Sequence, residues 1–155
     1  MKRFYLLFLS AGLIALPVNA EITAKQTDIM KQLMTKFAEK AKLEAKDPNA
    51  RGGASKHANK PFSAEIGREL YLKRRTWQDN DYSCSGCHTE DPAKVGKHIQ
   101  TKKPIKPLAP SVNPERFTDI QKVERNFTEH CMDLYERDCL AYDKGNFISY
   151  MMSLK

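Results

Sequence analysis

The stretch Cys84-Ser85-Gly86-Cys87-His88 decides which fold we expect for the whole chain. It is a C-x-x-C-H pentapeptide, the pattern typical of covalent attachment of a c-type haem. Two thiols one helical turn apart can bond to the two vinyl groups on one haem edge, and the adjacent histidine can bind the iron. We therefore expect one haem c, attached through Cys84 and Cys87, with His88 as the proximal iron ligand.

Two other interpretations of the pentapeptide fit the sequence less well. A structural zinc site needs a second pair of Cys or His ligands at matching spacing, and the sequence has no such pair. A thioredoxin-like C-x-x-C would follow a βαβ pattern, which is also missing. Ser83 or Asp81 can cap a short helix that carries the motif.

The N-terminus predicts export. Met1-Lys2-Arg3 is followed by an apolar run from Phe4 to Leu16 and by small residues at Val18 and Ala20, which indicates a signal peptide cleaved after Ala20. The run is shorter than the ~20 residues that cross a bilayer, so we expect no membrane span in the mature protein. Haem is attached to C-x-x-C-H proteins after export, which favours the periplasm. We expect a signal peptide over 1–20 and one haem domain over 21–155, with an N-terminal helix and linker over 21–60 and the haem core over 61–155.

The charge of the mature chain is moderately basic. Of the 26 lysines and arginines, removal of Lys2 and Arg3 leaves 24 against 19 acidic residues, a net charge of +5. This balance in an exported protein favours an acidic protein partner, or simple solubility, over nucleic acid. Lysines cluster after His88, where they can steer an acidic partner or form a solvated loop: Lys94, Lys97, Lys102, Lys103 and Lys106.

The chain has four cysteines, of which the haem would use two. An oxidising compartment would pair the remaining Cys131 and Cys139 in a short local bridge, worth roughly 2 kcal/mol by the loop-entropy estimate. Two disulfides without haem are the alternative, but they would leave His88 without a role.

Periodic apolar residues predict helices on both sides of the motif. We expect one over 21–45, a second that opens at Phe62 with Ser63 as its cap, and a last one over 144–154. Gly67 costs about 1 kcal/mol inside a helix relative to Ala, which predicts close approach of the last helix. Residues 73–81 are expected to form a polar loop.

The proline-rich segment after the motif is long for a small domain, which indicates a functional loop. We expect it to wrap the haem, with Ile105 and Leu108 against the ring, and the Pro107 carbonyl to accept a hydrogen bond from His88.

The distal iron ligand is predicted from a third helix, which opens with a capping box over 118–121. Its apolar stripe has helical spacing and includes a histidine: Ile120, Val123, Phe127, His130 and Leu134. We expect Phe127 to contact the haem and His130 to be the distal iron ligand, although a core histidine is the simpler interpretation of such a position. His98 is the second choice, and Met132 lies roughly 200° around the helix from His130.

Residues 84–154 resemble the sphaeroides haem protein family, the oxygen-binding cytochromes c. The segment 62–72 also resembles the family's first helix. The resemblance implies an all-α, class I-like cytochrome c fold, here with an additional N-terminal helix, and a disulfide between Cys131 and Cys139. The blocks that carry it are Cys84-Ser85-Gly86-Cys87-His88, Pro107-Leu108-Ala109-Pro110-Ser111, Pro114-Glu115-Arg116-Phe117-Thr118-Asp119, Val123-Glu124, and Cys131 with Arg137-Asp138-Cys139.

The sequence departs from the family at the distal ligand. The family's type member has an Asn directly before the first disulfide cysteine, which leaves the iron on reduction and lets O₂ or NO bind. His130 stands at this position, and Asn126 is one turn away. Two histidine ligands favour electron transfer and a lower potential than His/Met ligation.

We therefore expect a bis-His electron carrier, with the dihaem cytochrome partner that the resemblance implies. A protein that binds or reacts with O₂ or NO (and takes up CO) after His130 detaches is the alternative. The sequence places no acid or base group on the distal side, so we expect no enzyme, although catalysis stays open.

Overall fold

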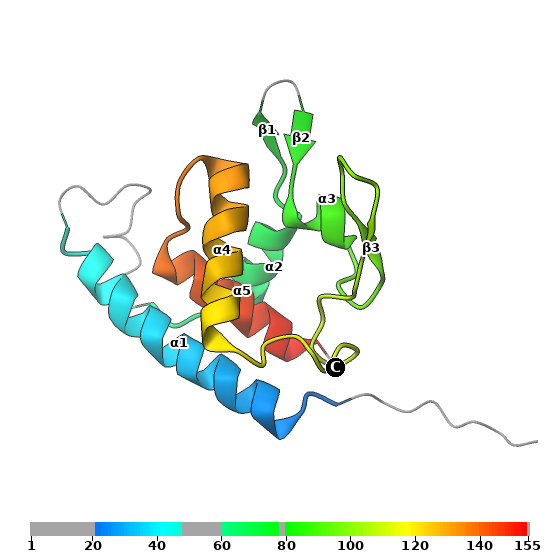
Figure 1. Cartoon of the computed structure of the whole chain (residues 1–155). Helices are drawn as coiled ribbons and strands as arrows, with labels where there is room; N and C mark the ends of the chain where they lie inside the picture. Colours follow the sequence, from blue (N-terminus) through cyan, green and yellow to red (C-terminus); the bar gives the residue numbers. More distant parts are fainter. Residues whose placement is uncertain (1–20, 48–59, 78–79, 155) are drawn as a thin grey trace, which may run out of the picture.

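The computed structural model of the chain describes residues 21–47, 60–77 and 80–154 (Figure 1). The predicted signal peptide and most of the predicted linker lie outside these residues. Helices dominate the described part, in the order α1 (Ala24–Glu44), α2 (Ala64–Leu72), β1 (Arg75–Trp77), β2 (Asn80–Tyr82), α3 (Cys84–His88), β3 (Gly96–Lys97), β4 (Pro104–Ile105), α4 (Ile120–Tyr135) and α5 (Ala141–Ser153). None of these helices combines the length and apolarity needed to cross a membrane.

Helices α2 and α5 cross at Gly67, as predicted. A Cβ atom at Gly67 would collide with the carbonyl oxygen of Asn146 and lie 2.9 Å from Cβ of Tyr150. Only glycine lets the two backbones approach this closely, which confirms the reason for its place inside a helix. Ser63 is the N-cap of α2, and its side chain accepts a hydrogen bond from the Ile66 amide.

Helix α1 packs its apolar stripe against the rest of the molecule and runs along its side in Figure 1. Met30, Leu33 and Phe37 are almost fully buried, and burial of each such side chain stabilises the fold by about 1.5–3 kcal/mol. The helix begins at a capping box in which Thr23 and Gln26 bond reciprocally. The predicted N-terminal helix is therefore confirmed, and it is part of the core.

The predicted polar loop over 73–81 is wrong, because the chain forms a short antiparallel hairpin there. Strands β1 and β2 pair with Arg75 opposite Tyr82, and β3 and β4 form a second hairpin after the motif. Strands of two or three residues are too short to show an alternating pattern. The first hairpin is held by tertiary contact, since the Arg75 guanidinium lies 5.1 Å from the ring centre of Tyr135 in α4.

Two helix starts differ from the predicted ones. The N-cap of α4 is Asp119, whose carboxylate accepts from the Lys122 amide, rather than the predicted box from Thr118. Helix α5 begins three residues before the predicted Lys144, because Glu44 of α1 accepts a hydrogen bond from the Ala141 amide at 2.9 Å. This cap comes from a distant helix and leaves no local signal in the sequence.

Candidate functional site

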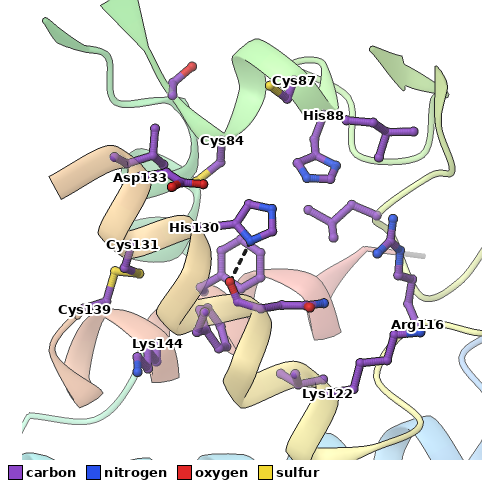
Figure 2. A pocket seen from close by; sticks show the side chains of 18 of the residues that line it. Cys84, Cys87, His88, Arg116, Lys122, His130, Cys131, Asp133, Cys139 and Lys144 are labelled. Carbon is purple, nitrogen blue, oxygen red and sulfur yellow. Dashed lines mark hydrogen bonds between the residues drawn. A yellow bond between two sulfur atoms is a disulfide. The ribbon is translucent and has the colours of Figure 1, made fainter. Parts of the chain in front are cut away.

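A cavity of about 980 Å³ lies between α3, the β3–β4 hairpin, the proline-rich loop and α4 (Figure 2). Its volume is at the upper end of the range typical of ligand pockets. The lining includes every residue that the sequence analysis assigned to the haem: Cys84, Cys87, His88, Ile105, Leu108, Phe127 and His130.

The cysteines stand on a single helical turn. Ser83 caps α3 by accepting a hydrogen bond from the Gly86 amide at 2.9 Å. Both thiols are free and partly buried, and burial raises the pKa of Cys84 to about 11. The β3–β4 hairpin closes against this turn, since a Cβ atom at Gly96 would collide with the Cys87 carbonyl oxygen.

His88 points its ring into the cavity from the end of α3 (Figure 2). Burial, with smaller contributions from Arg116 and His130, lowers the pKa of His88 to about 4. The ring is therefore neutral near pH 7, which is the form that binds metals.

Tyr71 of α2 fixes the main chain on which His88 stands. Its hydroxyl donates to the carbonyl oxygen of His88 at 3.1 Å and also contacts that of Thr89. The side chain is fully buried, and burial raises its pKa. Sequence analysis missed this role because Tyr71 is also an ordinary core residue beside Gly67.

His130 faces His88 across the cavity from α4. The two ring centres are 6.3 Å apart and the rings are tilted by 42°. Nδ1 of His130 lies 2.6 Å from the carbonyl oxygen of Asn126 one turn earlier. This contact orients the ring and leaves Nε2 for a ligand (Figure 2).

The structure also places the two alternatives to His130, which are His98 and Met132. Nδ1 of His98 accepts from the amides of Gln100 and Thr101 at 3.2 Å, which caps the turn of the β3–β4 hairpin. Met132 also borders the cavity, but its side chain is 48% exposed.

The predicted bond from His88 to the Pro107 carbonyl is wrong. That oxygen instead accepts hydrogen bonds from Nδ2 of Asn113 at 2.7 Å and from Nε of Arg116 at 3.0 Å. These two donors occupy its two lone pairs. The proline-rich loop is thus fixed by its own polar side chains, which the spacing of its prolines does not reveal.

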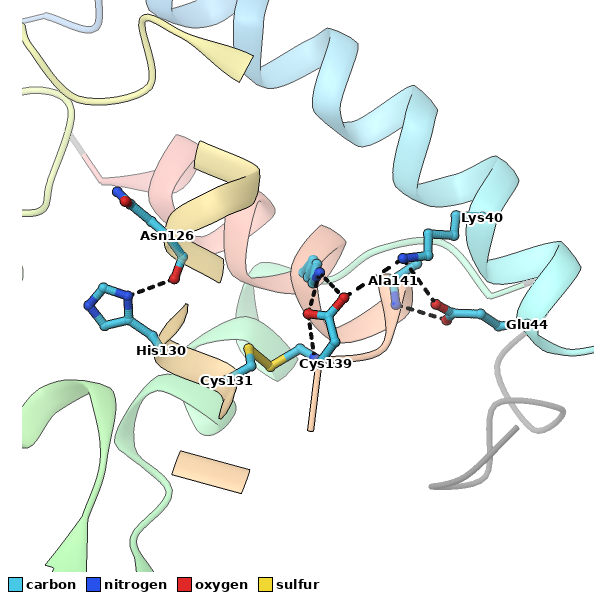
Figure 3. Close-up of a disulfide and its surroundings, with 9 residues drawn as sticks. Lys40, Glu44, Asn126, His130, Cys131, Cys139 and Ala141 are labelled. Carbon is cyan, nitrogen blue, oxygen red and sulfur yellow. Dashed lines mark hydrogen bonds and ion pairs between the residues drawn. A yellow bond between two sulfur atoms is a disulfide. The ribbon is translucent and has the colours of Figure 1, made fainter. Parts of the chain in front are cut away.

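A disulfide joins Cys131 and Cys139 directly after His130 (Figure 3). Asp138 in the closed loop bonds the almost fully buried Lys144 of α5 at 2.7 Å, and Lys40 of α1 lies 3.9 Å from the same carboxylate. The end of α4 that carries His130 is therefore tied to both α5 and α1.

These residues fit a haem attached along one edge. Imidazole nitrogens bind metals such as zinc at about 2.0–2.1 Å, and bonds of about 1.3–1.4 Å place each nitrogen roughly 1.1 Å from its ring centre. Two imidazoles whose nitrogens pointed straight at one metal ion from opposite sides would have ring centres roughly 6.3 Å apart, and the ring centres of His88 and His130 are 6.3 Å apart. The fold, the motif and the cavity define a c-type cytochrome with one covalently attached haem c.

Residues 57–151 match the protein family described as "Domain of unknown function (DUF1924)", and the chain belongs to this family. It is 51% identical over 81 residues to cytochrome c'' of Methylophilus methylotrophus, a match over 52% of this chain and 56% of that protein. It is 38% identical over 95 residues to the cytochrome c-type protein SHP of Cereibacter sphaeroides, a match over 61% of this chain and 73% of SHP. The matched region thus spans little more than half of the cytochrome c'' sequence.

Solved structures of both relatives have the same fold. Oxidised cytochrome c'' superposes with a TM-score of 0.66 at 35% identity, covering 83% of this chain and 96% of that one. Oxidised SHP, described as an oxygen-binding cytochrome c, superposes with a TM-score of 0.64 at 30% identity, covering 81% and 96%. A solution structure of cytochrome c'' is described as giving insights into haem-ligand detachment. The predicted all-α cytochrome c fold and the predicted resemblance to the SHP family are confirmed.

Proposed function

We propose that the protein is an exported, periplasmic cytochrome that carries single electrons on a haem with two histidine ligands. In this proposal Cys84 and Cys87 hold the haem covalently, His88 is the proximal ligand and His130 is the distal one. The observation that carries the proposal is the opposed pair of imidazoles, 6.3 Å apart between ring centres.

The surroundings of each histidine support these roles. The Asn126 carbonyl can only accept a hydrogen bond, so Nδ1 of His130 is the donor in this contact and Nε2 is left for a ligand. His88 is held neutral by burial. Ile105, Leu108 and Phe127 give the cavity an apolar lining, which excludes water from a bound haem.

The haem would supply an iron that gains and loses one electron, while the protein keeps both ligands in place. The exposed Lys97, Lys102 and Lys103 lie on the β3–β4 hairpin, whose His98 and Ile105 line the cavity. Cations beside the cavity would steer an acidic redox partner mainly through the association rate, which falls with salt. We propose a dihaem c-type cytochrome as this partner.

Binding of a small gas such as O₂, NO or CO after His130 moves away is the second candidate. The descriptions of SHP as oxygen binding and of cytochrome c'' in terms of haem-ligand detachment favour it. The His130 ring also borders open space, since the residue is exposed and, among the described residues, its side chain hydrogen-bonds within its own helix.

Visible spectra of the holoprotein and of two histidine variants test the proposal. In His130→Ala we expect loss of the distal ligand, a high-spin haem and rapid uptake of CO by the reduced protein. His98→Ala is the matched control, because His98 also lines the cavity, and its spectrum should stay low-spin.

A low-spin His130→Ala protein would contradict the assignment of His130, and a high-spin His98→Ala protein would transfer the role to His98. For the wild type, a reduced spectrum that CO leaves unchanged supports the electron carrier. Immediate uptake of CO by the reduced wild type supports the gas-binding candidate instead.

A further inference from the structure

The guanidinium of Arg116 is fixed at the wall of the cavity by main-chain carbonyls. Nε donates to the Pro107 oxygen at 3.0 Å, and one terminal nitrogen donates to the Lys106 oxygen at 2.9 Å. Arginine has five N–H donors, so these two bonds leave donors on the other terminal nitrogen for a ligand.

The charge of Arg116 forms no ion pair with the described residues around it. The neighbouring Glu115 carboxylate is turned to the solvent, where it binds Nζ of Lys106 at 2.7 Å. Asp119 serves as the N-cap of α4 and accepts from the Lys122 amide. Arg116 itself is half-buried; burial lowers its pKa, and the nearby Glu115 carboxylate opposes that shift to a smaller extent. A half-buried cation whose nearest carboxylate pairs with another lysine is stabilised when a further anion binds beside it.

Arg116 stands across the cavity from the attachment cysteines. Figure 2 shows Cys84 and Cys87 at one side of the opposed histidines and Arg116 on the other, with Lys122 nearby. A haem has its two vinyl groups and its two carboxylates on opposite edges. Thioether bonds to the cysteines would therefore direct the carboxylates toward the wall that carries Arg116.

Gln26 of α1 holds the main chain of Arg116 in place. Its side chain is fully buried, and Nε2 lies within hydrogen-bond distance of three carbonyl oxygens of the loop, those of Pro110 (3.1 Å), Asn113 (3.0 Å) and Arg116 (3.0 Å). The other end of the amide accepts two hydrogen bonds from Thr23 at 2.9 Å. Helix α1 lies before the matched family region 57–151, so this support comes from outside that region.

We propose that Arg116 is the binding site for a carboxylate group of the haem and that Gln26 of α1 positions it. The inference rests on the proposed haem site. Both the main chain and the side chain of Arg116 are fixed before a ligand binds, so little conformational entropy is lost on binding. The planar guanidinium also suits a carboxylate better than an ammonium group does.

Infrared spectroscopy of the holoprotein, with ¹³C at the haem carboxyl carbons, tests the proposal directly. We expect the labelled carboxylate band to shift in Arg116→Gln and to stay unchanged in the control Lys122→Gln, which removes an exposed cation from the same wall. We expect Gln26→Leu to shift the band in the same direction by less. That result would separate positioning from a purely structural role.

The reduction equilibrium gives a second measurement. Loss of a positive charge beside the haem favours the ferric state, so the ratio of ferrous to ferric protein at a fixed applied potential should fall severalfold in Arg116→Gln. A tenfold fall corresponds to 59 mV for one electron. Lys122→Gln should change the ratio less, because solvent screens an exposed charge.

An unshifted band in haem-loaded Arg116→Gln would overturn the proposal, and an unshifted band in Gln26→Leu would overturn the part that concerns Gln26. If Arg116→Gln does not mature, dipolar coupling between ¹⁵N-arginine and the labelled carbons in the wild type decides: coupling supports the contact and its absence refutes it. A wild-type protein without the mass of a haem would instead defeat the proposed function itself.

Discussion

Asp138→Asn should destabilise the protein through the cation that it leaves behind. The two carboxylate oxygens of Asp138 lie 2.7 Å and 2.8 Å from Nζ of Lys144. The Lys144 side chain is only 5% exposed, and its ammonium lies 5.8 Å from the ring centre of Phe127. The variant keeps the shape of the side chain and removes the charge that compensates this lysine.

The size of the effect follows from the exposure of the two partners. Loss of one partner from a fully buried pair costs about 3–5 kcal/mol, whereas exposed pairs contribute about 0–1 kcal/mol. The Asp138 side chain is 40% exposed, so water compensates part of the loss. We expect the free energy of unfolding to fall by about 2 kcal/mol, which corresponds to a fall in Tm of about 6 °C for a domain of this size.

Urea unfolding of the oxidised holoprotein measures this difference. Glu124→Gln is the matched control, because Glu124 also pairs with a lysine at 2.7 Å, but Lys36 is 55% exposed, so we expect a loss below about 1 kcal/mol. Equal small losses in both variants would refute the reasoning that the buried lysine depends on Asp138. Equal losses of about 2 kcal/mol in both variants would point to a general effect of surface charge instead.

Two further predictions concern the packing below the site. Gly67→Ala should lower the free energy of unfolding by about 3 kcal/mol or more, because the new Cβ would collide with the Asn146 carbonyl. As the control, Glu65→Ala at an exposed position of the same helix should change thermal stability by less than about 0.5 kcal/mol. A Gly67→Ala protein as stable as the wild type would contradict the close crossing. Tyr71→Phe should lower the free energy of unfolding, measured with urea, by about 1–3 kcal/mol, because the His88 carbonyl loses the hydrogen bond that the Tyr71 hydroxyl donates. Burial raises the pKa of Tyr71, so its contribution is complete below pH about 10 and is lost at higher pH as the unfolded chain ionises first. The Tyr71→Phe protein should lack this loss of stability at high pH. An identical dependence of the unfolding free energy on pH in both proteins would contradict the role of the Tyr71 hydroxyl.

The sequence by itself determined the class of the protein and pointed to seven residues that line one cavity in the structure. The C-x-x-C-H motif is a local chemical requirement, and the apolar stripe that includes His130 is a periodicity, so both can be recognised without coordinates. The same holds for Ser63, whose hydroxyl suits a helix start, and for Gly67, whose lack of a side chain suits a close helix crossing.

Only the tertiary structure decided which groups support these residues. Gln26 contacts Arg116 across 90 positions of the chain, and Glu44 caps α5 across 97. The Pro107 carbonyl accepts a hydrogen bond from Arg116 rather than from His88, which also depends on the tertiary arrangement of the loop. Hydrogen bonds between distant segments depend on how the helices pack, and no local pattern of residue types records that packing. Likewise, the rings of His88 and His130 face each other, with centres 6.3 Å apart, only because the fold brings α3 and α4 to opposite walls of one cavity.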